Sequence, residues 1–261
     1  MQGRWREVVA DLVAAWILAA SSTARAQDAS GIAAPETNPG EAEEYPTAYI
    51  ERPLTLPALM SEASLRAAYW WVDEEENVST TIVRASFGVT DWWQASAWTR
   101  WFVEPDREWA QTVGFATRAL TLDTARVDVA PGLSALLRFD GDRATAPVPA
   151  LTIDGNARIR VFRRGAVYVG NDLARFGFGD VASLSIDLNA AYVLQMNAHL
   201  SLHIWVQLFH IRVAGDVPES GGPYVPGLTW FISPASWLDL WIAGYLGSRS
   251  DGISAGVAAR F

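Results

Sequence analysis

The last ten residues alternate strictly between two kinds of side chain, and this pattern constrains the fold more than any other part of the sequence. One parity of residues 252–261 is apolar and the other is mostly small or polar, that is Ile253, Ala255, Val257, Ala259 and Phe261 against Ser254, Gly256, Ala258 and Arg260. Successive side chains of a β-strand point to opposite faces, so the alternation indicates a strand with one apolar side. Such a strand separates an apolar environment from a polar one.

The same strand resembles the C-terminal assembly signal of bacterial outer-membrane β-barrels. That signal has a polar residue, a glycine two places on, and apolar residues at the third-last and last positions, here Ser254, Gly256, Ala259 and Phe261. The resemblance covers only this terminal strand. It implies a transmembrane barrel that the barrel-assembly machinery inserts into the outer membrane, and it implies no particular function.

The beginning of the chain has the pattern of an exported leader. Residues 1–26 combine a basic start at Arg4 and Arg6, an apolar run at 8–20, and a small-x-small cleavage site ending at Ala26. Asp11 interrupts the apolar run, and a membrane-spanning helix needs about 20 apolar residues. We therefore expect a signal peptide that is cleaved near Ala26.

Composition favours a barrel over the alternative, a secreted β-sandwich. Half of the residues are hydrophobic and 13 are tryptophan, yet no other stretch is long and apolar enough for a membrane helix. Barrel strands need only about 9–11 residues of alternating character, so they carry this apolar load without a hydropathy peak. The chain has no cysteine, which excludes disulfides, thiol catalysis and thiolate metal sites.

Alternating patterns fill most of the remaining sequence and predict an all-β fold, a transmembrane antiparallel up-and-down barrel of about twelve strands. The predicted strands cover residues 63–72, 79–89, 92–103, 108–121, 124–139, 150–162, 165–170, 181–194, 198–213, 225–233, 236–246 and 252–261. The pattern at 165–170 is the weakest, so about ten strands is the alternative. The barrel domain is thus expected to span residues 61–261.

Connector lengths alternate as in membrane barrels, where short periplasmic turns alternate with longer outer loops. Tight turns are predicted at residues 90–91, 122–123, 163–164, 195–197 and 234–235. Longer connections are predicted at 73–77, 140–149, 171–180, 214–224 and 247–251, with 104–107 as a short exception. A sandwich with Greek-key connections has no reason to alternate in this way. Residues 27–60, rich in Pro, Ala and acid, are predicted to form an irregular periplasmic arm or a partial plug, with 54–59 tucked into the barrel mouth.

Parity assigns a mainly basic set of charged side chains to the barrel interior. The whole chain has a formal charge of -9, so its acidic residues are concentrated in the arm and outer loops. The predicted lining comprises Arg66, Arg84, Arg100, Arg118, Arg126, Arg138, Arg158, Arg160 and Arg260 against Asp128, Asp154, Asp187 and Asp239. Rings of arginine in a pore wall favour anions. These residues predict a narrow, anion-preferring pore for small solutes.

The alternative is a non-conducting structural or adhesion barrel whose lumen is filled by ion pairs, because barrels of intermediate size lie between filled and open ones. Aromatic residues near strand ends are expected to form girdles against outer-membrane lipid. A sugar-binding track inside the lumen is a further interpretation, resting on the inward parity of Trp92, Trp98, Trp205, Trp237 and Trp241.

One strand also carries candidate catalytic residues. Ser201 and His203 share a face, and a three-residue turn at 195–197 places Asn189 opposite His203 and Asp187 diagonal to it, which gives a nucleophile, a base and an orienting group for a barrel hydrolase. The His199-x-Ser201 spacing resembles that of the outer-membrane phospholipase barrel, where the pair faces lipid, whereas here parity places it inside.

The sequence predicts no metal site, cofactor or nucleic-acid partner. His199 and His203 lie roughly 13 Å apart along a strand, too far to share one ion, and His210 has the opposite parity. No glycine-rich phosphate loop follows a strand and opens a helix. The exposed arm and loops are acidic and would repel phosphate.

Overall fold

The computed structural model describes residues 45–72, 77–104, 107–140, 148–178, 182–214, 217–221, 224–246 and 250–261. The predicted leader and the first part of the predicted arm lie outside these residues. One short 3-10 helix, η1 (Tyr49–Glu51), precedes the strands, and two strands are short, β5 (Leu122–Asp123) and β11 (Val217–Gly221). The long strands are β1 (Ser61–Val72), β2 (Val78–Thr90), β3 (Trp93–Glu104), β4 (Arg107–Ala119), β6 (Val127–Asp140), β7 (Val148–Phe162), β8 (Gly165–Phe178), β9 (Ala182–Asn197), β10 (Leu200–Ala214), β12 (Tyr224–Ala235), β13 (Leu238–Tyr245) and β14 (Ser250–Arg260).

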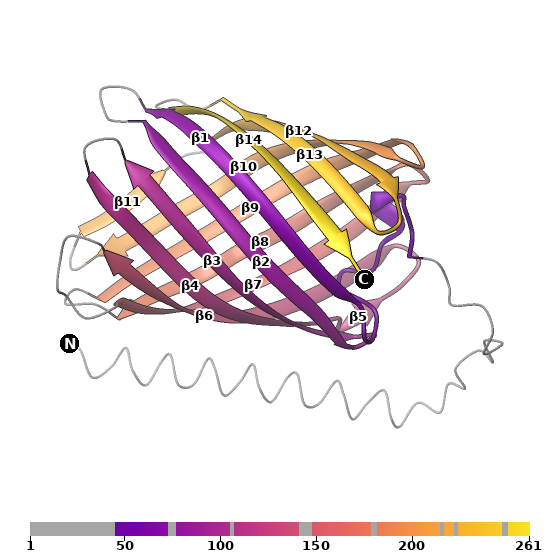
Figure 1. Cartoon of the computed structure of the whole chain (residues 1–261), viewed down its shortest axis with the longest axis horizontal. Helices are drawn as coiled ribbons and strands as arrows, with labels where there is room; N and C mark the ends of the chain where they lie inside the picture. The colour runs from indigo at the N-terminus through magenta and orange to yellow at the C-terminus, as the bar shows by residue number, and fades with distance from the viewer. Residues whose placement is uncertain are drawn as a thin grey trace. The chain divides into compact units, whose positions relative to one another are not determined.

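The long strands form one closed antiparallel barrel. Each pairs with its neighbour in the chain, and β1 pairs with β14 from Glu62↔Arg260 to Val72↔Ser250, which joins the first strand to the last. Figure 1 shows the strands tilted across the barrel, with β14 lying beside β1. Closure removes the two free edges that an open sheet would have. The predicted up-and-down barrel of twelve strands is confirmed, and the ten-strand alternative is wrong.

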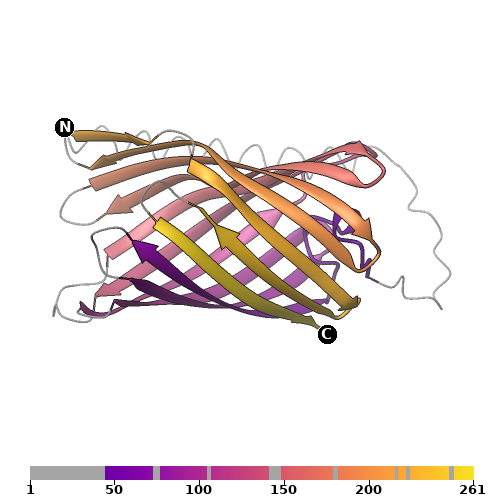
Figure 2. The ribbon, with the colours of Figure 1, turned by 90° about the horizontal axis from the view of Figure 1, so that it is seen from above.

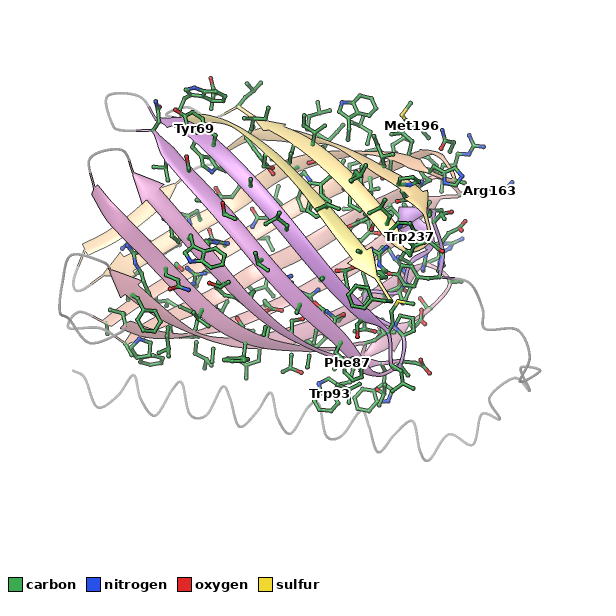
Figure 3. All side chains as sticks on the ribbon, viewed as in Figure 1. Tyr69, Phe87, Trp93, Arg163, Met196 and Trp237 are labelled. Atoms are coloured by element: carbon green, nitrogen blue, oxygen red, sulfur yellow. The ribbon has the colours of Figure 1, made fainter. Side chains whose placement is uncertain are left out.

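Short turns gather at one end of the barrel, which we call the short-turn end. It holds the turns at residues 91–92, 163–164, 198–199 and 236–237 and the C-terminal Phe261. Figure 3 shows the labelled Phe87, Trp93, Arg163, Met196 and Trp237 at this end. By the rule for outer-membrane barrels, the short-turn end is the periplasmic end.

Several predicted connections differ from the observed ones. The turns predicted at 90–91 and 234–235 lie at 91–92 and 236–237. Residues 195–197 belong to β9, and the turn lies at 198–199. Residues 122–123 form β5, which pairs with β6, so the link between β4 and β6 is a loop rather than a tight turn. Most of the predicted loop at 171–180 is strand, because β8 continues to Phe178. The pairing of β8 shifts register between Gly170 and Ala174, and this irregularity interrupts the two-residue period from which strands are predicted.

Side chains on the two faces of the barrel have opposite character. The outer face exposes large apolar residues on strands all around the ring, among them Leu65, Trp71, Val83, Phe115, Leu137, Ile159, Ile204, Trp230, Ile242 and Ile253. The interior buries polar and charged residues, among them Thr112, Asp128, Ser134, Arg158, Gln195, Thr229, Asp239, Ser254 and Arg260. This distribution reverses that of a water-soluble protein and suits a barrel surrounded by lipid. Among the described residues, no helix is long and apolar enough to cross a membrane.

Gly170 is the clearest test of this backbone arrangement. Its φ is +142°, which L side chains rarely adopt, and an added Cβ would overlap the carbonyl oxygen of Gly155. We expect Gly170→Ala to lower the free energy of unfolding by about 1–3 kcal/mol, measured by urea unfolding of the refolded protein in lipid vesicles. The matched control is Gly244→Ala, because a Cβ there would meet nothing within 4 Å. Equal unfolding midpoints for the two variants would contradict the prediction.

Candidate functional site

A cavity of about 700 Å³ lies inside the barrel, and its charged lining is mainly basic. We call this cavity the chamber. Eight arginines line it against four carboxylates, namely Arg52, Arg66, Arg84, Arg100, Arg118, Arg158, Arg175 and Arg260 against Glu62, Asp154, Asp187 and Asp239. All 20 basic residues of the chain are arginine, and none is lysine. A guanidinium stays charged at any physiological pH and binds carboxylate or phosphate through two parallel hydrogen bonds.

Three of the arginines come from adjacent strands and form what we call the arginine wall. Arg66 of β1 and Arg100 of β3 both lie opposite Ile82 of β2, and Arg84 follows two residues after Ile82 on the same face. Directly opposite residues are about 5 Å apart at Cβ and diagonal ones about 7–8 Å. The arginine wall therefore concentrates three positive charges on one side of the chamber.

The arginine wall also contacts aromatic side chains. Arg66 Nη2 donates to the Tyr245 hydroxyl at 2.8 Å. The guanidinium carbon of Arg100 lies 5.9 Å from the centroid of the Trp98 ring and 5.6 Å from that of Phe102. These distances are in the range of cation–π interactions.

Each carboxylate of the chamber lining has a partner among residues outside the arginine wall. Asp239 accepts hydrogen bonds from Arg52 and Arg260, and Glu62 forms an ion pair with Arg260 at 2.9 Å. Asp154 lies 3.4 Å from Arg118. Asp187 accepts from Gln207 at 2.9 Å and contacts His210 at 2.5 Å. The chamber lining as a whole still has more arginines than carboxylates.

Residues 45–60 enter the barrel at the short-turn end, and we call them the mouth segment. The indigo stretch that contains η1 lies at this end in both views (Figures 1 and 2). Arg52, only 5 % exposed, donates to both carboxylate oxygens of Asp239 at 2.7 and 2.9 Å and to the Ser233 hydroxyl at 2.8 Å. This pairing attaches the mouth segment to β12 and β13.

Side chains of strands away from β12 and β13 form hydrogen bonds with the main chain of the mouth segment. Arg158 of β7, 2 % exposed, donates to the carbonyl oxygens of Ile50, at 3.0 Å, and of Arg52. The amide of Ile50 donates to Gln195 on β9, and the amide of Leu56 donates to Gln94 on β3. Bonds to strands on several sides show that the mouth segment crosses the barrel opening.

A cluster of aromatic rings also joins the mouth segment to the barrel wall. The ring centroid of Tyr49 lies 4.5 Å from that of His203, 4.8 Å from Phe231 and 5.7 Å from Tyr168. Burial raises the pKa of the Tyr49 hydroxyl, so it remains neutral. Of the residues predicted to tuck into the mouth, Leu54 lines the chamber and Leu56 is buried, whereas Leu59 is 79 % exposed.

The predicted lumen residues divide into two groups. Those that line the chamber are Arg66, Arg84, Arg100, Arg118, Asp154, Arg158, Asp187, Asp239 and Arg260. Asp128 is on the inner face as predicted, but it is buried beneath Arg158 and Arg160 and does not line the chamber; it accepts from Arg158 at 2.5 Å and from Arg160 at 3.1 Å. Arg138 is exposed on β6, away from the chamber lining.

Arg126, predicted to face inward, is exposed in the bend before β6. The strand begins only at Val127, because the Thr124 hydroxyl accepts from the Val127 amide at 2.8 Å and closes a turn. Two lining arginines were missed by sequence reasoning. Arg175 lies in the stretch predicted as a loop, and Arg52 lies in the irregular arm, where no period indicates which way a side chain points.

The candidate catalytic residues do not assemble as predicted. Ser201 Oγ lies 2.8 Å from His203 Nε2, but both side chains are buried, 1 % and 2 % exposed. The turn at 198–199, with a bulge after Leu200, places His203 opposite Val193, Asn189 opposite Gln207, and Asp187 opposite His210. Neither predicted orienting group is therefore next to His203. The arrangement lacks the predicted triad, and Tyr49 covers its base.

The three histidines have separate partners. His199 Nδ1 lies 2.8 Å from the Ser233 carbonyl oxygen, His203 contacts Ser201, and His210 contacts Asp187. In the part of the chain that the structure describes, no cluster of three or more His, Cys, Asp or Glu is arranged to hold a metal ion.

Of the tryptophans with predicted inward parity, Trp98, Trp205 and Trp241 line the chamber. Trp92 and Trp237 were predicted inward but are 42 % and 56 % exposed at the short-turn end. Both lie in turns, where the alternation of a strand no longer holds. In the terminal strand, Ser254 is buried inside, while Phe261 is 76 % exposed and its amide donates to the Ser61 carbonyl oxygen at 3.0 Å.

Comparison with known proteins adds evidence on the fold. No protein-family model matches the sequence, and no curated protein matches it. Among solved structures, the COG4313 outer membrane channel from Pseudomonas putida F1 is similar, with a TM-score of 0.55 and 11% identity over 87% of this chain and 100% of that chain. The NanC porin has a TM-score of 0.53 and 8% identity over 76% of this chain and 98% of that chain. This chain thus has the fold of bacterial outer-membrane β-barrels, as its terminal strand predicts.

Proposed function

We propose that the protein is a narrow outer-membrane pore that passes small solutes and prefers anions. The observation that carries the proposal is the lining of the chamber, with eight arginines against four carboxylates. Positive side chains in a confined pore lower the energy of an entering anion and raise that of a cation. The similarity of the fold to an outer membrane channel and a porin supports a pore. Insertion by the barrel-assembly machinery, through β14 and Phe261, is part of the proposal.

The position of the charges supports a selective path rather than a uniformly filled interior. The ion pairs of Arg52, Arg158 and Arg260 are concentrated at the short-turn end, around the mouth segment. The arginine wall on β1, β2 and β3 lines the chamber beyond them. A solute that enters from the opposite end meets the arginine wall before it reaches the mouth segment.

The mouth segment also favours a second candidate, a structural or adhesion barrel that does not conduct. Arg52 and Arg158 hold this segment across the barrel opening with buried, charge-assisted hydrogen bonds. Removing one partner of a buried ion pair typically lowers stability by about 3–5 kcal/mol, so these pairs attach the mouth segment firmly to the barrel. The two candidates differ in whether the barrel conducts while the segment is in place.

Ion selectivity tests the first candidate. In planar bilayers with a salt gradient, we expect the reversal potential of the wild-type protein to show anion preference. Replacing Arg66, Arg84 and Arg100 with Gln should reduce the anion-to-cation preference by roughly fourfold per arginine. One charge about 10 Å from an ion in water contributes about 0.4 kcal/mol, which is favourable for an anion and unfavourable for a cation. Arg163→Gln, in the exposed turn labelled in Figure 3, is the control and should change nothing. Cation preference, or no effect of the triple substitution, would refute the proposal.

Attachment of the mouth segment can be measured separately, because the chain has no native cysteine. Ile50→Cys, at a position 5 % exposed, should react slowly with a thiol reagent. Adding Arg52→Met should raise its labelling rate at least about tenfold, which corresponds to a loss of about 1.4 kcal/mol from the seated state.

Leu59→Cys, at a position 79 % exposed, is the control and should label at the same rate in both backgrounds. If the wild type is silent in bilayers and Arg52→Met conducts, the mouth segment closes the pore. If both remain silent although labelling shows release, the non-conducting barrel is the correct function.

A further inference from the structure

Two tryptophans of the chamber lie flat against its wall. Trp98 of β3 is directly opposite Gly114 of β4, and Trp241 of β13 is directly opposite Gly256 of β14. A Cβ added to either glycine would overlap the facing indole, so each ring occupies the space above its glycine. Because the ring lies along the wall instead of pointing at the barrel axis, the indole presents a face to the chamber rather than an edge.

Other aromatic side chains on the same face of the sheet repeat this pairing. Trp70 of β1 lies opposite Gly252 of β14, and Tyr245 of β13 lies opposite Gly227 of β12. In both cases a Cβ on the glycine would overlap the ring. Pairing an aromatic residue with a cross-strand glycine is thus repeated in this barrel, and it keeps large rings flat against the inner wall.

The arginine wall lies between the two flat indoles. Along one row of the sheet, Trp241 is followed by Gly256, Arg66, Ile82 and Arg100 on successive strands. Adjacent strands are about 4.8 Å apart. The Trp241 ring, which covers Gly256, is therefore about one strand spacing from Arg66.

The second indole is equally close to the arginine wall. Trp98 is directly opposite Arg84, and its ring centroid lies 5.9 Å from the guanidinium carbon of Arg100. The Arg100 guanidinium thus lies over the Trp98 ring, and Arg66 lies beside the Trp241 ring. A six-membered ring bearing a carboxylate can reach a guanidinium from either indole. The side chain between Arg66 and Arg100 is Ile82, which is apolar and lines the chamber.

We propose that the arginine wall and the two flat indoles form a binding site for aromatic carboxylates. The guanidinium groups bind the carboxylate through paired hydrogen bonds, and the planar ring of the solute stacks on an indole face. The apolar Ile82 between the arginines favours an unsubstituted ring over one that carries hydroxyl groups, which would have to give up bonds to water there. The inference rests on the proposed function, since the solute enters the same chamber.

Calorimetric titration of the refolded full-length protein in micelles tests this site without requiring conduction. We expect benzoate to bind, and acetate and benzyl alcohol, which lack the ring and the carboxylate respectively, to bind at least about tenfold more weakly. Trp98→Leu and Trp241→Leu should each weaken benzoate binding by about two- to tenfold, the usual range for loss of one aromatic stack. Trp98→Phe keeps a flat ring and should retain most of the affinity.

Trp230→Leu is the matched control, because Trp230 faces outward on β12 and is 42 % exposed. It should leave benzoate binding unchanged. The site is refuted if benzoate binds no more tightly than acetate, if galacturonate, a hydroxylated ring acid, binds more tightly than benzoate, or if Trp98→Leu and Trp241→Leu have no effect. Anion-selective conductance without benzoate binding would refute the binding site but not the proposed function. Benzoate binding with cation-selective conductance would refute the proposed selectivity of the pore but not the binding site.

Discussion

The hydrogen-bonded ladder between β1 and β14 is the contact on which the rest of the structure depends. It runs from Glu62↔Arg260 to Val72↔Ser250 and joins the first strand to the last. In a lipid environment, every backbone amide and carbonyl must be bonded within the protein, and for strands only a closed barrel satisfies this requirement. Once the ring is closed, one side-chain parity faces lipid and the other faces an enclosed space, so a basic interior can coexist with an apolar exterior.

The enclosed space is divided between a packed end and an open one. At the short-turn end, Arg52 and Arg260 share Asp239, and Arg158 bonds both Asp128 and the main chain of the mouth segment. Buried charges are tolerated when they are paired, and Arg52, Arg158 and Arg260 each have a carboxylate partner. The chamber beyond it keeps an excess of arginine, which is why the same interior supports both a selective path and an attached mouth segment.

Parity in the sequence predicted most of the charged lining correctly, and two of the wrong assignments arise where a turn or a bulge sets the position of the strand. Arg126 was misplaced because a side chain–backbone bond at Thr124 delays the start of β6. Asn189 and Asp187 were misassigned as partners of His203 because the turn at 198–199 and the bulge after Leu200 set a different register. A small shift in a turn moves every downstream pair, and a shift of one residue reverses the faces. Turn and bulge geometry is not contained in a two-residue period.

The sequence by itself determined that the chain forms a membrane barrel with a basic interior, because period-2 alternation and connector length are local properties. The closed ring decided between twelve strands and ten. Only the tertiary structure decided which charges meet, that residues 45–60 cross the barrel opening, and that Trp98 and Trp241 lie flat over glycines. These features depend on cross-strand register and on contacts such as that of Arg52 with Asp239, 187 residues apart in sequence. Alternation specifies the face on which a side chain lies, but its neighbours on that face are set by how the strands align when the ring closes.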